Sequence, residues 1–400
     1  MHTLLITGPG GAGRTTVAAA TALAAARQGR RVLLLSGDVG DPLAALTGEP
    51  VGEPAEAAPG LPAVPVAGGI RVARVDSGEE FRAELAALQE RGSALLGMLG
   101  ARPMGAEELT ELPGAEQFAL LRALRRAAAA PGHDLLVVDL PPLHQALATL
   151  ALPAQLRRYL ARLLPAQRQA ARALRPVLAQ LAGVPMPAQW LYEAAARWDE
   201  ELAAVQAVTE APTTEVRLVA EPGPAAADAI RAGRLGFALQ QLPVSAVVAN
   251  RLLPEGSADP WLAGLAAQQE KHASAWAGEL PVVRLAHLGR DPRGPQDLEP
   301  LSAAGGLVPP TPAPRRAWAV EDRLAEDGVL VWVVPLPGAH KRELDLIRRG
   351  DELLLTVGPY RRTVALPAAL RRCTVSGAAL AEDGLRIRFT PDPGLWPRTP

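Results

Sequence analysis

Residues 3–16 read TLLITGPGGAGRTT, and the alanine-rich residues 17–27 follow. An apolar strand, a glycine-rich loop and a helix in this order are typical of a phosphate-binding element. Glycines let consecutive backbone N–H groups converge on an anion, and the N-terminus of the helix adds a positive dipole. The alternative interpretation is a tight strand-to-helix turn that binds nothing. The stretch predicts an α/β protein whose first loop holds a phosphate.

The loop fits the pattern G-x-x-x-x-G-K-[ST] at Gly8, Gly13 and Thr15, but Arg14 occupies the lysine position. Lysine brings a compact charge to the β- and γ-phosphates, whereas a guanidinium is wider, planar and not interchangeable with it. We therefore expect hydrolysis to suffer more than binding. The hydroxyl of Thr15 is expected to bind Mg²⁺. The predicted phosphate-binding residues are Gly10, Gly11, Ala12, Gly13, Arg14, Thr15 and Thr16.

Short apolar runs alternate with helical segments along the first three quarters of the chain. This alternation predicts a doubly wound, mostly parallel sheet with helices on both faces, and ligands on such sheets bind at the carboxyl ends of strands. The runs are residues 3–7, 32–35, 70–75, 135–138, 216–220, 244–249 and 282–285.

Two segments interrupt this pattern. Residues 153–210 carry leucine and alanine at helical spacing without a strand signal, which indicates a helical insertion. Residues 305–316, GGLVPPTPAPRR, contain four prolines, as expected of a stiff linker, and short β-type runs follow. We predict a nucleotide-binding domain over residues 1–304, a linker over 305–317 and a small β-sandwich over 318–400.

Composition excludes several classes of function. The 41 basic and 42 acidic residues leave no field that would attract nucleic acid. The single cysteine, Cys373, cannot form an internal disulfide or supply the thiolates of a zinc site, so we expect no zinc, oxygen ligands for any metal, and a reducing cytoplasm. The first residues lack a signal-peptide pattern, and no apolar stretch reaches the roughly 20 residues of a membrane span. We expect no secretion and no integral membrane protein.

Further motifs follow the loop in a recognisable order. LLLSGD ends at Asp38, DLLVVDLPP contains Asp139, ANRLLP contains Asn250 and Arg251, and DPRG contains Arg293. Together with the loop, these motifs resemble the ArsA and guided-entry ATPases of the deviant Walker A class, the guided-entry members of which target tail-anchored proteins. Both lysines of that class are replaced here, by Pro9 and Arg14.

The resemblance implies a role for each motif. Asp38 would orient the attacking water, Asp139 would hold Mg²⁺ through water, and Asn250 would read the edge of adenine. Arg251 and Arg293 would lie beside the bound nucleotide. The expected cofactors are ATP or ADP with Mg²⁺, and the expected assembly is a homodimer or a mixed dimer with a paralogue.

The last part of the chain resembles the small heat-shock-protein-like, or α-crystallin, domain of some ArsA-like proteins. The motifs are PLPGA at 335–339, RGDEL at 349–353 and LP at 366–367. In this part we interpret Arg361 and Arg362 as a solvated strand face and Cys373 as a buried filler.

The predicted function is a nucleotide-dependent conformational switch with weak or absent ATP hydrolysis. Two alternatives stay open: a pseudo-ATPase scaffold for protein contacts, and an active ATPase formed as a mixed dimer. Metalloid pumping is not supported, because one thiol cannot supply three soft ligands. The helical insertion carries Met186, Trp190, Leu191, Tyr192 and Trp198, which either bind an apolar protein client or pack on the insertion's own core.

Overall fold

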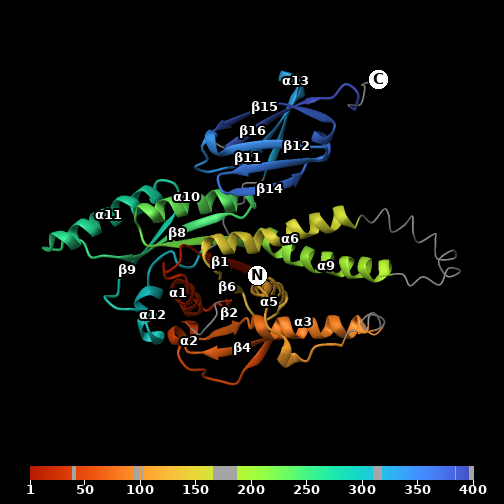
Figure 1. Cartoon of the computed structure of the whole chain (residues 1–400). Helices are drawn as coiled ribbons and strands as arrows, with labels where there is room; N and C mark the ends of the chain where they lie inside the picture. The colour runs from red at the N-terminus through yellow and green to blue at the C-terminus, as the bar shows by residue number, and fades with distance from the viewer. Residues whose placement is uncertain are drawn as a thin grey trace.

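The computed structural model describes residues 1–37, 42–93, 97, 100, 102–164, 187–309, 318–382 and 384–395 (Figure 1). The strands of its large sheet are β1 (His2–Thr7), β2 (Val32–Ser36), β3 (Ala55–Ala58), β4 (Leu61–Val66), β5 (Ile70–Arg74), β6 (Leu135–Asp139), β7 (Thr214–Ala220), β8 (Val244–Leu252) and β9 (Val282–Ala286). They lie in the order β3-β4-β5-β2-β6-β1-β7-β8-β9. All neighbours from β5 to β9 pair in parallel. The predicted mostly parallel sheet is confirmed.

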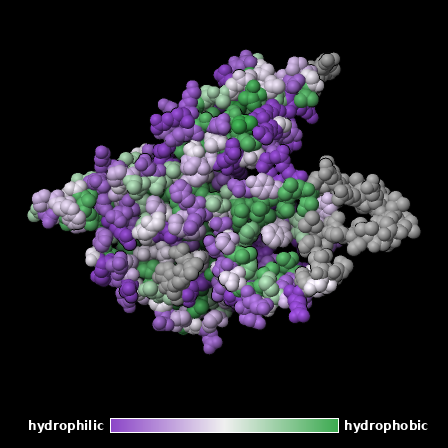
Figure 2. Space-filling view, viewed as in Figure 1, coloured by the Kyte–Doolittle hydropathy of each residue, from purple (hydrophilic) through white to green (hydrophobic). Residues whose placement is uncertain are grey.

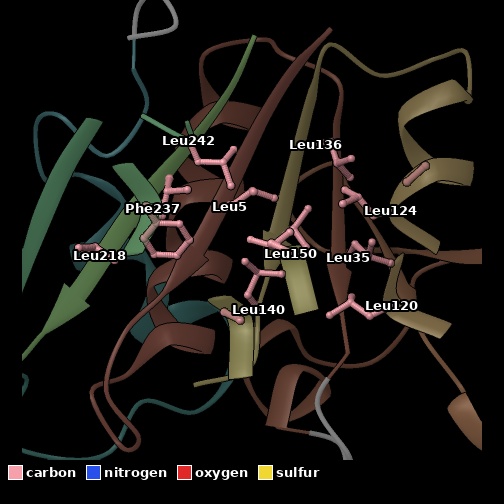
Figure 3. Close-up of a cluster of buried hydrophobic side chains, with 14 of the residues drawn as sticks. Leu5, Leu35, Leu120, Leu124, Leu136, Leu140, Leu150, Leu218, Phe237 and Leu242 are labelled. Carbon is pink, nitrogen blue, oxygen red and sulfur yellow. The ribbon is translucent and has the colours of Figure 1, made fainter. Parts of the chain in front are cut away.

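Most positions of the central strands are apolar, because helices bury both faces of the sheet. Figure 3 shows the apolar side chains on one of these faces, with Leu5, Leu136 and Leu218 among them. Leu5 points to the face that is covered by α5 (Ala115–Ala129), α6 (Leu143–Leu163), α10 (Pro224–Leu239) and α11 (Pro260–Ala277). Leu4 and Ile6 point to the opposite face, which is covered by α1 (Arg14–Arg27), α2 (Pro42–Thr47) and α12 (Gly294–Ser302). Successive side chains on a strand alternate between faces, so one apolar strand supplies two cores.

The sheet is extended beyond β5 by an antiparallel hairpin that the sequence analysis did not predict. Strand β4 pairs with β5 and β3 pairs with β4. Pro62 and Pro65 lie within β4 and break its apolar run, and prolines are rare inside sheets. The hairpin forms the outer, antiparallel part of the sheet, with β3 as its edge strand.

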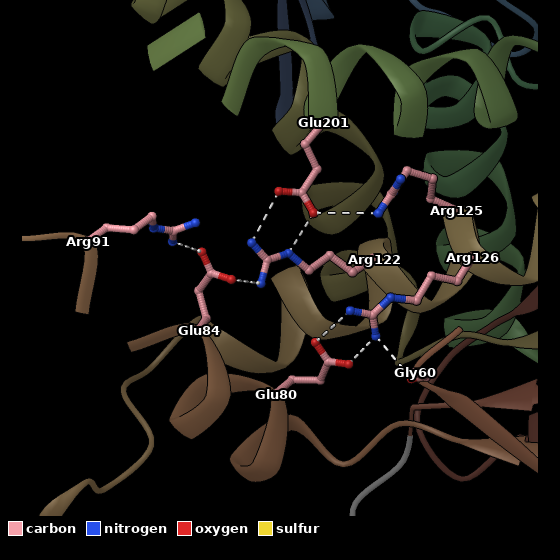
Figure 4. A network of polar contacts seen from close by, with 8 residues as sticks. All are labelled: Gly60, Glu80, Glu84, Arg91, Arg122, Arg125, Arg126 and Glu201. Atoms are coloured by element: carbon pink, nitrogen blue, oxygen red, sulfur yellow. Dashed lines mark hydrogen bonds and ion pairs between the residues drawn. The ribbon is translucent and has the colours of Figure 1, made fainter. Parts of the chain in front are cut away.

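Helices α6 and α9 (Pro187–Glu210) lie side by side and project from the sheet (Figure 1). They include the described parts of the predicted helical insertion; residues 165–186, with Met186, and the side chains of Trp190 and Leu191 lie outside the described residues. An arginine network joins α9 to α5 and α3 (Ser77–Arg91) (Figure 4). In it, Arg122 of α5 bonds Glu201 of α9 at 2.7 Å and Glu84 of α3 at 3.0 Å.

The C-terminal part is the predicted β-sandwich. One sheet has the order β10 (Ala319–Arg323), β11 (Val329–Val334), β16 (Gly384–Pro391), β15 (Cys373–Ala381). The other has the order β12 (Leu344–Arg349), β13 (Glu352–Val357), β14 (Tyr360–Ala365). Trp332, Leu355 and Phe389 of the two sheets share one core. Cys373 is 1% exposed in this core and burial raises the pKa of its thiol, which confirms the expected filler.

The expectation for Arg362 was wrong, whereas Arg361 is exposed as predicted. Alternation along β14 turns Arg362 toward the large domain, where its guanidinium donates to the carbonyl of Leu239 at 2.5 Å and lies 5.5 Å from the ring centre of Trp318. Burial lowers the pKa of Arg362. The residue is part of the contact between the domains.

The helices in the described part of the chain are each too short or too polar to cross a bilayer.

Candidate functional site

The glycine-rich loop lies between the end of β1 and the start of α1, and it is bonded to the loop that follows β6. Gly8 accepts a hydrogen bond from the backbone N–H of Leu143 at 3.0 Å. The hydroxyl of Thr7 donates to the carbonyl of Pro141 at 2.8 Å. A Cβ atom on Gly8 would lie 1.9 Å from the carbonyl oxygen of Val219 on β7, so only glycine fits there. The sequence motif therefore has a packing reason as well as a chemical one.

Arg14 is the first residue of α1 and its side chain reaches the loop after β6. Its guanidinium donates to the carbonyl of Leu140, which directly follows Asp139. Gly13 precedes the helix and has no side chain with which to cap it. The N-terminus of a helix attracts an anion through its positive dipole. The backbone thus has the form that a phosphate requires, while the cation of the motif is bonded to a carbonyl.

Asp139 is fully buried at the carboxyl end of β6, between β1 and β2. Its carboxylate accepts a hydrogen bond from the hydroxyl of Ser36 at the end of β2, at 3.3 Å. The contact of Arg14 with Leu140 brings the start of α1, including the half-buried Thr15, to the same edge of the sheet. A carboxylate and a hydroxyl at this edge are the oxygen ligands that Mg²⁺ prefers. Asp38 lies outside the described residues.

Asn250 lies directly against the loop. Its side chain is 5% exposed at the end of β8, and its amide donates to the carbonyl of Ala12 at 2.9 Å. A Cβ atom on Gly13 would lie 2.4 Å from the amide nitrogen of Asn250. The structure thus brings Asn250 to the loop residues with which the sequence grouped it. Its amide N–H group bonds loop backbone here, and its predicted contact with adenine stays a prediction.

Arg251 closes over the loop from the same strand. It has φ 58°, which is unusual for a residue other than glycine, and its guanidinium donates to the carbonyl of Gly11 at 3.0 Å. Gln269 of α11, which the sequence analysis did not single out, donates to the carbonyl of Arg251 at 3.1 Å and accepts from Leu253 N–H at 2.8 Å. Gln269 is 5% exposed. A polar residue on an otherwise apolar face of a helix is the sequence signal that could have identified it.

The remaining predicted nucleotide ligand, Arg293, is exposed at the residue before α12. Its backbone N–H donates to the carboxylate of Asp297 at 2.8 Å, so the backbone of this residue forms the start of a helix. Between this loop and Asn250 lies a cavity of about 20 Å³, which has room for about one water molecule and not for a purine. A purine would fit between Asn250 and this loop only if the loop moved.

Among the described residues, no group of three or more histidine, cysteine, aspartate or glutamate side chains is placed to hold a metal ion. Two residues supply oxygen donors at the edge of the sheet, Thr15 from α1 and Asp139 from β6. A metal at this edge would depend on the phosphate oxygens of the nucleotide for further ligands.

Three bacterial relatives are similar to this chain over nearly its whole length. The chain is 60% identical to an uncharacterized protein of Streptomyces coelicolor over 400 residues, which is the whole of both chains. It is 30% identical to a protein of Mycobacterium tuberculosis over 429 aligned residues, covering 98% of this chain and 97% of the other. It is 26% identical to a protein of Aquifex aeolicus that carries the name of an arsenical pump-driving ATPase, covering 97% and 99%.

Family profiles match both parts of the chain. The profile of the HSP20-like domain found in ArsA matches residues 327–389, in the β-sandwich. The profile of the anion-transporting ATPases matches residues 1–302, which include the glycine-rich loop, Asp139 and Asn250. The chain therefore belongs to the ArsA family of anion-transporting ATPases.

Proposed function

We propose that this chain is a nucleotide-responsive switch that binds ATP or ADP with Mg²⁺ at residues 10–16 and hydrolyses ATP weakly or not at all. The observation that supports the weak hydrolysis is the bond from Arg14 to the carbonyl of Leu140. A charge held on the loop after β6 is not available to neutralise the phosphates as a lysine would. Family membership supports the use of nucleotide.

The proposed ligands of Mg²⁺ are Thr15 and, through water, Asp139. In this proposal Asp38 orients water in whatever hydrolysis remains, and Arg293 joins the nucleotide when its loop moves. The output is conformational, because Gly8 and Thr7 are bonded to the loop after β6 and a ligand in the loop would shift those bonds. The proposed assembly is a homodimer or a mixed dimer with a paralogue; a mixed dimer in which the paralogue supplies the missing lysine would be the active ATPase that is the alternative to this switch.

A second candidate is a scaffold that no longer binds nucleotide, and the cavity of about 20 Å³ beside Asn250 favours it. A scaffold needs a surface for protein contacts. A pocket of about 310 Å³ between α3, α5 and α9 has an apolar lining that includes Phe81, Phe118 and Trp198. Figure 2 shows apolar side chains gathered on this side of the molecule. An apolar protein segment is the client that such a lining would accept.

The arsenical pump named in the Aquifex relative is not proposed here. Arsenite is bound by soft thiolates, and Cys373 is the single cysteine, buried at 1% exposure in the β-sandwich.

Calorimetry of Mg²⁺-ADP and Mg²⁺-ATP tests the switch against the scaffold. The switch predicts binding to the natural chain and at least about tenfold weaker binding to Asp139→Ala, because one Mg²⁺ ligand is lost. Asp134→Ala is the matched control, since Asp134 precedes β6 at the opposite end of the same strand and is exposed. Absence of heat with either nucleotide would leave the scaffold, which crosslinking of an apolar peptide to a photoreactive residue at position 198 would then test.

A further inference from the structure

The two domains are held together by charged contacts around α6 and α10. Arg158 of α6 makes a bidentate pair with Glu352 of β13, at 2.8 and 2.9 Å. Arg231 of α10 bonds Glu343 at 3.1 and 3.3 Å. Arg362 of β14 donates to the last residue of α10, Leu239. Bidentate pairs of this kind fix an orientation, so the space between the domains has defined walls.

That space includes a cavity of about 730 Å³ between α6 and the β-sandwich. Its size is in the range of sites for small molecules. Its charged lining residues are Glu352 and five arginines, and the large domain and the β-sandwich both contribute arginines. The arginines are Arg157, Arg158, Arg162, Arg361 and Arg362.

The acidic residues present pair with only some of these arginines. Glu352 holds Arg158 closely and lies 3.8 Å from Arg162, and Asp199 holds Arg157 at 2.9 Å. Arg361 has no acidic partner among the residues that the structure describes, and the side chain of Arg162 is 61% exposed. The cavity is therefore lined by an excess of positive charge, which attracts anions.

A second, independent feature is the indole of Trp332, which also lines the cavity. The residue is 3% exposed, and in the described part of the chain its ring nitrogen has no hydrogen-bond partner. Trp318 packs edge-on against Trp332 at 5.6 Å and supports Arg362 on its face. A buried donor without an acceptor costs free energy, and a ligand oxygen would remove that cost.

We propose that the cavity between the domains is a second ligand site, for a small polyanion whose phosphate or carboxylate oxygens are held by Arg162 and Arg361. Guanidinium groups bind both kinds of oxyanion through paired N–H donors. Because Arg162 belongs to α6 and Arg361 to β14, a bound polyanion joins the two domains. The site is distinct from residues 10–16 and does not depend on whether nucleotide binds there.

The test is calorimetry of the full chain with pyrophosphate and, separately, with citrate, each in the absence and presence of saturating Mg²⁺-ADP. The phosphate and carboxylate arms identify the class of oxyanion. We expect binding of at least one polyanion that persists with Mg²⁺-ADP present, and a change in tryptophan fluorescence from Trp318 and Trp332. Arg162→Gln and Arg361→Gln should each weaken this binding at least about tenfold.

Arg388→Gln is the matched control, because Arg388 is exposed on β16 of the other sheet and does not line the cavity. It should leave polyanion binding unchanged. The proposal is overturned if neither polyanion binds at millimolar concentration, if Mg²⁺-ADP displaces all bound pyrophosphate and citrate does not bind, or if binding is equal in the natural chain and in both cavity variants. Loss of nucleotide binding alone would refute the switch and leave this site intact.

Discussion

The guanidinium of Arg14 donates a hydrogen bond to the backbone carbonyl of Leu140, across the edge of the sheet from α1 to the loop after β6. This bond joins the residue that replaces the lysine of the phosphate loop to the residue that follows Asp139. The arginine that replaces the lysine thus makes a structural contact between the two segments that face the predicted phosphate site.

Arg14→Lys should raise the rate of phosphate release from ATP. Lysine presents a compact ammonium group to phosphates, and a single transition-state contact of this type changes rates by about 10²-fold or more. Arg27→Lys is the control, because Arg27 is the other arginine of α1 and pairs with Glu299 outside the site. Equal turnover in the natural chain and both variants would contradict a role of Arg14 in suppressing hydrolysis.

Gly8→Ala should destabilise the chain severely, whereas Gly10→Ala should be tolerated. A Cβ atom on Gly8 would lie 1.9 Å from the carbonyl oxygen of Val219, and one on Gly10 would meet nothing within 4 Å. We expect Gly8→Ala to lose roughly 3 kcal/mol or more of unfolding free energy and Gly10→Ala less than about 1 kcal/mol. Urea unfolding measures both. Similar midpoints for the two variants would contradict the packing argument.

Gly13→Ala and Asn250→Ala should be energetically coupled. At Gly13, φ is 86°, and an added Cβ would lie 2.4 Å from the amide nitrogen of Asn250. We expect Gly13→Ala to cost about 2 kcal/mol, and Asn250→Ala in that background to recover about 1 kcal/mol, because the clash disappears and the backbone strain remains. A double-mutant cycle by urea unfolding gives the coupling. Strictly additive effects would show that the two residues do not clash.

Arg122→Ala should lower the unfolding free energy by about 2 kcal/mol, because it removes the partly buried cation that two carboxylates share. The side chain of Arg122 is 15% exposed; burial alone would lower its pKa, but hydrogen bonds with Glu201 and Glu84 raise the pKa above its usual value. Arg91→Ala is the control, since Arg91 pairs with Glu84 on the surface and should cost less than about 1 kcal/mol. Thermal unfolding distinguishes the two, and equal losses would contradict the prediction.

The pKa of Asp134 should be found near 2 by NMR titration of its carboxyl carbon. The side-chain hydrogen bond from Arg31, followed by the one from the backbone N–H of Arg31, lowers this pKa to about 2. A carboxyl group with a lowered pKa in the folded chain stabilises it above the unfolded pKa of about 3.9, and this contribution is lost as the pH falls toward 2. Arg31→Ala should return the midpoint toward 3.9. An unchanged midpoint would mean that Arg31 is not the cause.

The sequence predicted the elements whose signals are local. The seven parallel strands could be predicted because strands that are buried on both faces are mainly apolar, as are the central residues of β1 and the first four residues of β6. The hairpin of β3 and β4 could not be predicted, because Pro62 and Pro65 interrupt the apolar pattern of β4. Arg362 was misjudged because its burial depends on a contact with Leu239, 123 residues away, which no local pattern reveals.

For the site, the motif order identified the right neighbours but not their contacts. Strand order explains why Asn250 lies against the loop, because only β7 separates its strand β8 from β1. The bond from Arg14 to Leu140 and the role of Gln269 depend on side-chain directions that only the folded chain fixes. The roles of the predicted nucleotide ligands remain predictions for the experiments above.

Helix α6 begins at Leu143, whose N–H bonds Gly8 of the phosphate loop, and Arg158 near its other end bonds Glu352 of the β-sandwich. A helix of 21 residues is about 30 Å long. Pro153 lies within this helix. If α6 moves as one body, a tilt of roughly 5° at the loop displaces its far end by roughly 2.5 Å. The residues of α6 that line the cavity between the domains lie toward that end of the helix. A small displacement at the phosphate loop would therefore become a larger displacement at the cavity. It would change the contacts of α6 with any ligand that the cavity binds.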